Sequence, residues 1–173
     1  MKKLLIIFLL FGFISCANAT TLSGGIKYTQ EDARLELQHN RPSANFILNT
    51  EGVDSYYVEN HTALLKGLTK LKDRTLAQFS DGSYGINYYN DPTHVYYYDK
   101  DGTLINAEIK TSTQYPYRTY KYSPDGELVT MTMRVSEEET FIFDPRGKLL
   151  GHWMGNNCYD ENGAILMTRK IMK

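Results

Sequence analysis

The side chains that most often carry out catalysis are few in this chain and are widely spaced. The four histidines are His39, His61, His94 and His152, and none stands at metal-ligand spacing from another histidine, a cysteine or a carboxylate. The sequence also lacks His-Glu-x-x-His, Cys-x-x-Cys and Gly-x-Ser-x-Gly motifs. These observations predict no metal, no cofactor and no catalytic residue.

One pair, Cys158 and His152, could form a thiol nucleophile and its base if the two residues lay on neighbouring strands. A reactive thiol needs a partly exposed, electropositive surrounding, whereas a free cysteine is commonly a buried small apolar side chain. We therefore interpret Cys158 as buried and the protein as non-catalytic. The alternative in the enzyme class is an envelope hydrolase whose acid and base residues come together only in the fold.

Tyrosine is the residue type that most favours a binding function. The chain has 14 Tyr, against 7 Phe and 1 Trp. Consecutive strand residues face opposite sides, so Tyr97 is expected to point away from Tyr96 and Tyr98. Tyrosine is enriched at interfaces because it combines a large rigid ring with a polar tip. We predict a tyrosine-rich sheet face that binds a protein or glycan, with candidate residues Tyr88, Tyr89, Tyr97 and Tyr117. The alternative is that tyrosine simply has a high β-propensity.

Length and charge narrow the classes of protein further. The chain has 173 residues and a formal net charge of −1, from 19 Lys and Arg against 20 Asp and Glu. This length corresponds to one ordinary domain with a sizeable core. The balanced charge lacks the basic excess typical of nucleic-acid-binding proteins, so no nucleic-acid partner is expected.

Residues 1–19 have the pattern of a secretory signal peptide. Lys2 and Lys3 precede an apolar run from Leu4 to Ile14, and Ala17-Asn18-Ala19 has the small-x-small pattern of a cleavage site. The run is short for a transmembrane helix. We therefore expect an exported protein, periplasmic or extracellular, with no membrane span in the mature chain.

The same segment allows a second form of export. Phe13-Ile14-Ser15-Cys16 is similar to a bacterial lipobox, in which a small residue precedes a cysteine that becomes lipidated. The box usually has Leu where this chain has Phe13. The alternative localisation is therefore a lipoprotein that is anchored through Cys16.

A repeated pattern organises the second half of the chain. An aromatic residue is followed by Asp or Ser, two variable residues, Gly, one further residue and an aliphatic one, in residues 98–104, 122–128, 143–149 and 159–165. Residues 79–82 form a shortened version. Asp or Ser first, Pro allowed second and Gly last is typical of a type I turn that ends in a left-handed glycine. Each unit is therefore predicted to be a β-hairpin.

The turn geometry predicts which side chains pair across each hairpin. The residue before Asp or Ser should lie opposite the second residue after Gly. The predicted pairs are Tyr98 with Leu104, Tyr122 with Leu128, Phe143 with Leu149, and Tyr159 with Ile165. One sheet face should therefore be a ladder of rings and aliphatic side chains.

This hairpin tip resembles the tyrosine–aspartate repeats of RHS-type bacterial surface proteins and is similar to variant MORN-type repeats of small exported bacterial proteins. The resemblance covers residues 79–166 and rests on the Tyr-Asp-x-x-Gly-x-Leu core, without the Gly-Arg that usually precedes it. It implies an exported hairpin array that acts as a scaffold or a binding surface. The MORN-type similarity also implies an alternative function as an immunity or antitoxin-like partner protein.

The sequence before the repeats has a different character. Thr29-Gln30-Glu31-Asp32 is similar to a capping box and predicts a helix to about Gln38, and residues 62–72 have leucines at helical spacing. The predicted fold is mainly β: an antiparallel meander of about five β-hairpins in residues 73–173, with a short α-helical or irregular N-terminal cap in residues 20–72. Apolar residues such as Ile105 and Leu150 fall on the second sheet face, so we expect the cap or a partner to cover that face.

Overall fold

The computed structural model describes residues 20–21, 27–42 and 73–172 of the chain. Strands β1 (Thr20–Thr21) and β2 (Lys27–Tyr28) form a small sheet before helix α1 (Gln30–His39). Ten further strands follow: β3 (Arg74–Phe79), β4 (Tyr84–Tyr88), β5 (His94–Tyr98), β6 (Leu104–Lys110), β7 (Tyr117–Tyr122), β8 (Leu128–Arg134), β9 (Glu139–Phe143), β10 (Leu149–Met154), β11 (Asn157–Tyr159) and β12 (Ile165–Met172). The predicted mainly β class is confirmed. The predicted signal peptide, with Cys16, and the predicted helix in residues 62–72 lie outside the described residues.

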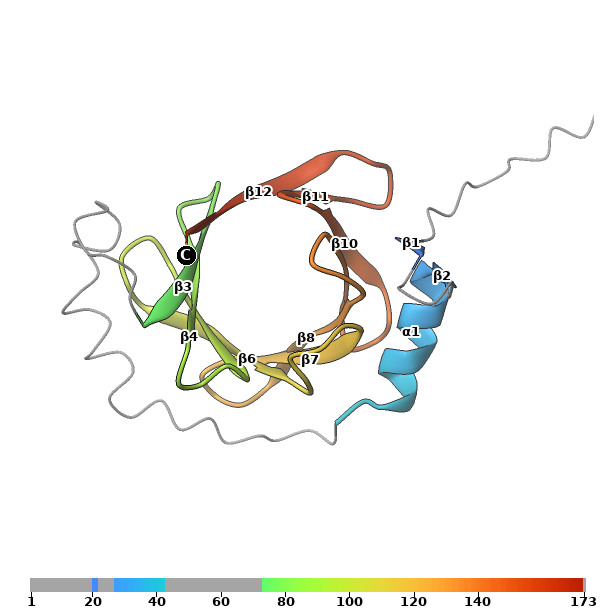
Figure 1. Cartoon of the computed structure of the whole chain (residues 1–173), viewed down its shortest axis with the longest axis horizontal. Coiled ribbons are helices and arrows are strands. Elements are labelled where there is room, and N and C mark those ends of the chain that lie inside the picture. The colour runs from blue at the N-terminus through green and yellow to red at the C-terminus, as the bar shows by residue number, and fades with distance from the viewer. Residues whose placement is uncertain (1–19, 22–26, 43–72, 173) are drawn as a thin grey trace, which may run out of the picture.

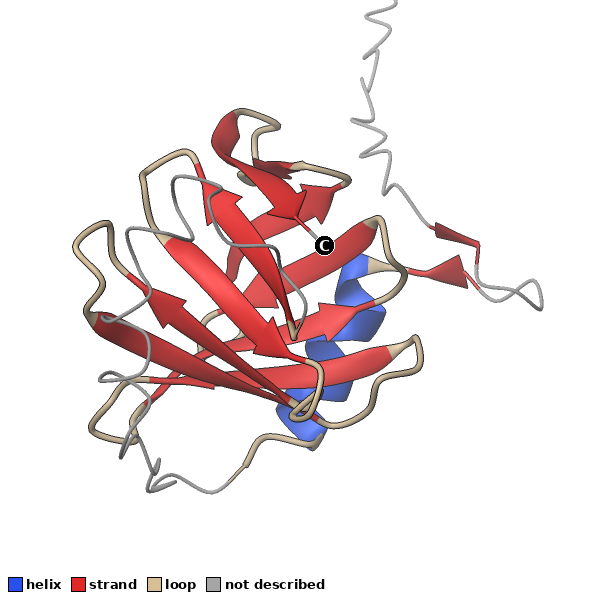
Figure 2. Cartoon of the chain, turned by 60° about the vertical axis from the view of Figure 1, so that its left-hand side comes forward, coloured by secondary structure: helices blue, strands red, loops and turns tan. Residues whose placement is uncertain are grey.

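The ten strands close into a barrel. Each strand pairs antiparallel with the next one in sequence, and β12 pairs back with β3, from Arg169 opposite Phe79 to Met172 opposite Leu76 (Figures 1 and 2). The predicted meander of hairpins is therefore wrong, because the strands form a closed barrel. Closure depends on the combined tilt and stagger of all ten strands, which the pattern of a single hairpin does not contain.

The hairpin turns follow the prediction closely. Gly102, Gly126, Gly147 and Gly163 have φ values of 91°, 85°, 88° and 83°. In the turn after β5, the Asp99 carboxylate accepts hydrogen bonds from the N–H groups of Asp101 and Thr103, both at 2.9 Å. All four predicted cross-strand pairs are present. The glycine turns all connect an odd-numbered strand to the next one, so they lie at one end of the barrel, here called the glycine-turn end.

Four of the hairpins contain a β-bulge that the sequence reasoning missed. In each, one residue is inserted directly after the predicted aliphatic partner, and the inserted residues are Ile105, Val129, Leu150 and Leu166. As a result, Tyr97 pairs with Asn106 and not with Ile105. Such bulges bend and twist a strand strongly, which favours closure of the sheet.

Gly163 allows the need for a positive φ in these turns to be tested separately from side-chain contacts. A Cβ atom added there would have no heavy atom within 4 Å, so only the positive φ opposes a side chain. We expect Gly163→Ala to lower the free energy of unfolding by about 1 kcal/mol or more. The exposed residue Glu161, in the same turn, supplies the control, since Glu161→Ala should change stability by less than about 0.5 kcal/mol. Equal thermal melts of the two variants would contradict the turn assignment.

Helix α1 covers one side of the outer barrel face. Thr29 caps the helix in a capping box with Asp32, as predicted. Ala33 and Leu37 pack on β8 and β9, in a cluster with Tyr120, Tyr122, Met131, Met133, Val135, Phe141 and Phe143. The helical cap therefore lies on the face that carries the ladder of rings. The second face, which we expected the cap or a partner to cover, is instead the inside of the barrel.

A second apolar cluster lies on the outer face of β3 to β6. Its buried members are Leu76, Tyr84, Ile86, Tyr98 and Leu104. The rings of Tyr84 and Tyr98 stack with centroids 5.5 Å apart and an interplanar angle of 13°. Both side chains are fully buried. The expectation that Tyr98 belongs to the core is confirmed.

Candidate functional site

The inward faces of the ten strands enclose two cavities that share part of their lining, here together called the lumen. The larger cavity, of about 360 Å³, lies toward the glycine-turn end, and the smaller one, of about 240 Å³, lies toward the opposite end. Both are lined by Phe79, Tyr97, Glu108, Arg134 and Arg169. These five residues form the waist of the lumen and come from β3, β5, β6, β8 and β12.

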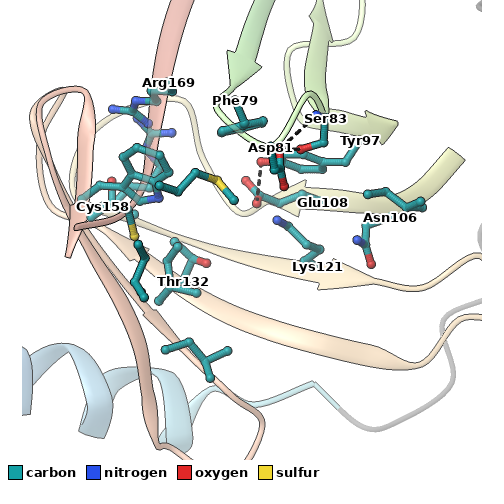
Figure 3. A pocket seen from close by; sticks show the side chains of 18 residues that line it. Phe79, Asp81, Ser83, Tyr97, Asn106, Glu108, Lys121, Thr132, Cys158 and Arg169 are labelled. Atoms are coloured by element: carbon teal, nitrogen blue, oxygen red, sulfur yellow. Dashed lines mark hydrogen bonds between the residues drawn. The ribbon is translucent and has the colours of Figure 1, made fainter. Parts of the chain in front are cut away.

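Tyr97 stands at the centre of the waist. Its hydroxyl donates a hydrogen bond to Glu108 Oε2 at 3.1 Å, and Lys121 Nζ lies 3.8 Å from the centre of its ring (Figure 3). The Phe79 ring stacks on it at 6.2 Å. Burial, together with the charge of Glu108, raises the pKa of Tyr97 well above its ordinary value, so the phenol stays protonated.

The lumen holds more positive than negative charge. Lys110, Lys121, Arg134 and Arg169 line it, whereas Glu108 is its one buried carboxylate among the residues that the structure describes. Asp81 and Glu137 are exposed and line its two ends. Within the described ranges, none of the four cations forms an ion pair with a carboxylate. Glu108 acts on Lys110, Lys121 and Arg134 at once and offsets their charge only in part, so the described lining keeps a positive excess.

Some donor groups of these cations form hydrogen bonds within the described part of the chain, and others do not. Lys110 Nζ donates to Asn87 Oδ1 at 2.8 Å, and Arg169 Nη2 donates to the carbonyl of Gly155 at 2.9 Å. Among the described residues, the buried Nε atoms of Arg134 and Arg169 have no hydrogen-bond partner. Burial lowers the pKa values of Lys110, Lys121 and Arg169. An anion in the waist would provide both acceptors for these donors and compensation for their charge.

The wall formed by β9 to β12 is largely apolar. Trp153, the one tryptophan of the chain, is buried there beside Cys158, Ile142 and Met167. The Arg169 guanidinium lies 4.7 Å from the centre of the Trp153 ring. The fluorescence of Trp153 is therefore a built-in probe of what enters the lumen.

The structure places the four predicted binding tyrosines in three different surroundings. Tyr97 and Tyr117 face the lumen, and burial raises the pKa of Tyr117 to about 12. Tyr88 lies on the outer face, where the Arg74 guanidinium is 5.0 Å from its ring centre. Tyr89 is 54% exposed in the turn after β4. The four residues therefore do not form one surface, and Tyr97 is not on an open sheet face.

Sequence reasoning missed the charged residues of the waist, although a signal for them was present. Lys121 occupies the same repeat position as Tyr97, one residue before the aromatic residue of the turn. Glu108 pairs with Lys121 and Tyr117 pairs with Arg134, which places these four side chains on the inward face. Strand alternation alone assigns them to the second face, but only closure makes that face an interior.

The cysteine–histidine pair does not form. Cys158 points into the lumen, whereas His152, on the neighbouring strand, lies on the outer face. There His152 Nε2 is 3.0 Å from Glu139 Oε1, and its ring stacks on Phe141. Burial raises the pKa of the Cys158 thiol, and the interpretation of this residue as a buried side chain is confirmed. In the described part of the chain, no three His, Cys, Asp or Glu side chains are arranged to hold a metal ion.

The chain was compared with protein-family models, curated proteins and solved structures, and none of the three comparisons found a match. Among residues 20–21, 27–42 and 73–172, no helix is long and apolar enough to cross a membrane. We therefore base the functional inference on the lumen itself.

Proposed function

We propose that this protein is a non-catalytic binding protein that holds a small anionic ligand inside its barrel. The observation that carries this proposal is the set of four cations around one buried carboxylate in a single lumen. An anion at the waist would lie within reach of Arg134 and Arg169, whose Nε donors have no partner in the part of the chain that the structure describes. Hydrogen bonds to charged groups are worth about 1.5–3 kcal/mol each, more than neutral ones.

The size and position of the site favour a small molecule. A cavity of about 360 Å³ falls within the range of small-molecule sites, which starts near 300 Å³. Tyr97 would contact a ligand at the waist from inside the barrel, and Tyr117 lines the smaller cavity. A protein or glycan would have to use outer residues, such as the exposed Tyr89. If the chain is exported, as its first 19 residues predict, the ligand is one that the protein meets outside the cytoplasm.

The proposal can be tested with benzoate and its uncharged analogue benzamide. Both are flat and similar in size, so they differ mainly in the charge that the lumen cations would recognise. We expect benzoate to change the fluorescence of Trp153 in a saturable manner and to release heat in calorimetry, at concentrations where benzamide does neither. Equal binding of the two compounds, or no binding of benzoate, would contradict the proposal.

A pair of lysine variants locates the binding within the barrel. Lys121→Met removes a lumen charge while keeping a long side chain, and should weaken benzoate binding about tenfold, the equivalent of 1.4 kcal/mol. Lys170 follows the lumen residue Arg169 in β12, but its side chain is exposed on the outer face, opposite Gln78. Lys170→Met is therefore the matched control, and this variant should bind benzoate normally. An equal loss in both variants would mean that the anion binds the protein through its overall charge.

A further inference from the structure

The glycine-turn end of the lumen has an apolar entrance. The inserted bulge residues Ile105, Leu150 and Leu166 line the larger cavity, and we call them the rim residues. They are 38%, 43% and 54% exposed. Three exposed aliphatic side chains at the opening of a cavity form an apolar surface that solvent reaches and that a ligand could cover.

Apolar surface continues from the rim residues toward the waist. Ile142, Met167 and Trp153 line the same cavity from β9, β12 and β10. Arg134 and Arg169 belong to the waist, and Lys121 on β7 approaches Tyr97 there (Figure 3). A molecule that filled this cavity would therefore meet charge at its inner end and an apolar wall that reaches the opening, while Asp81, Ser83 and Asn106 belong to the rest of the lining.

The opposite end of the lumen has a mixed lining, in which Ala77, Val95 and Ile171 lie beside polar and charged groups. Lys110, Asn87, Tyr115 and Glu137 line the smaller cavity there. Lys110 and Asn87 are hydrogen-bonded to each other. An alkyl chain that left through this end would pass the hydrogen-bonded pair of Lys110 and Asn87, whereas at the glycine-turn end the three rim residues line the cavity together with Asp81 and Ser83. The larger cavity therefore offers an alkyl chain more large aliphatic side chains than the smaller one does.

From this arrangement we propose that the ligand is an anionic amphiphile, a straight-chain carboxylate whose head lies at the waist and whose alkyl chain runs out past the rim residues. This inference rests on the proposed function and adds the chemical class of the ligand. The carboxylate accepts hydrogen bonds from Arg134 and Arg169. The alkyl chain contacts Trp153, Met167 and the rim residues, and removes their apolar surface from water.

A series of carboxylates tests the role of the chain. Acetate, butyrate, hexanoate and octanoate are titrated against the protein, with Trp153 fluorescence and calorimetry as readouts. We expect the affinity to rise by up to about fourfold for each added methylene that becomes buried, as 0.8 kcal/mol per methylene implies. Octylamine, with the same chain and the opposite charge, should not bind.

A matched pair of neighbouring residues tests the route of the chain. Leu166 is a rim residue, whereas the adjacent Ile165 is 58% exposed on the outer face, where it pairs with Tyr159. Leu166→Ser should weaken octanoate binding several-fold and leave acetate and butyrate binding unchanged. Ile165→Ser should change none of them. An equal effect of both variants on octanoate would overturn the proposed route.

The outcomes separate this inference from the proposed function. If benzoate binds but the affinity of the carboxylates does not increase with chain length, the lumen is an anion site and the amphiphile proposal is wrong. If octylamine binds as well as octanoate, both proposals are wrong. The alternative occupant of the rim residues is a second copy of the chain. A lower sedimentation coefficient of ligand-free Leu166→Ser, relative to the unmodified protein, would reveal such a dimer and would also overturn the inference.

Discussion

Replacement of Tyr98 by alanine is expected to lower the free energy of unfolding by about 3–5 kcal/mol, the usual range for large-to-small changes at a fully buried aromatic residue. Tyr98 has no exposed surface, and its ring stacks on the ring of Tyr84. It also pairs with Leu104 across the β5–β6 hairpin. Truncation would leave a cavity beside Tyr84 and Leu104 in the outer cluster. Urea unfolding of the two proteins measures the difference.

Tyr89 supplies the matched control for this prediction. It is 54% exposed in the turn after β4, so Tyr89→Ala removes the same side chain with little loss of packing. Its unfolding free energy should change by less than about 1 kcal/mol. If Tyr98→Ala unfolded at the same urea concentration as Tyr89→Ala, the outer face of β3 to β6 would not be a core.

Replacement of Lys170 by proline is expected to open the barrel at the seam between β12 and β3. The Thr168 carbonyl accepts from the Ser80 N–H on the β3 side, whereas the Arg169 N–H donates to Asn156 on the other side. Since these directions alternate along a strand, the Lys170 N–H points toward β3, opposite Gln78. Proline removes this donor and is confined to edge strands and bulges. We expect a loss of about 3 kcal/mol.

Lys170→Ala separates the backbone effect from the loss of the side chain. The lysine side chain is exposed, so this variant should remain within about 0.5 kcal/mol of the original protein. Hydrogen exchange adds a local readout, because the proline variant should lose protection of amides in β3 and β12 before those in β7 and β8. Equal stability of the proline and alanine variants would show that the seam is not formed and that the sheet is open.

The local structure of this protein could be predicted from short stretches of sequence. The type I turn with its glycine depends on five consecutive residues, and the pairing of Tyr98 with Leu104 follows from that turn alone. The helix start at Thr29 follows from a four-residue capping box. In each case the decisive interactions join residues close in sequence. The bulge after Leu104 was not predicted, because it adapts the hairpin to the curvature of the whole sheet.

The candidate site could be predicted only in part, for a related reason. Alternation correctly places Tyr97 on the side opposite Tyr96 and Tyr98, and the registers of β6 to β8 add Glu108, Lys121 and Arg134 to that side. Nothing in one hairpin indicates whether this side faces solvent, a cap or the inside of a barrel. We expected Tyr97 on a sheet face that a partner binds, and the structure places it in the lining of both cavities inside the barrel.

The sequence by itself therefore determined the hairpins, their glycine turns, the ladder of rings on one face and the position of the helix start. The secretory pattern in residues 1–19 remains a prediction of export, since these residues lie outside the described part of the chain. Only the tertiary structure decided that β12 meets β3 and that four cations share one lumen. The physical reason is the separation in sequence of the residues that interact. Turns and caps depend on neighbouring residues, whereas the lumen exists only because Arg169 in the last strand lies beside Phe79 in the first strand of the barrel.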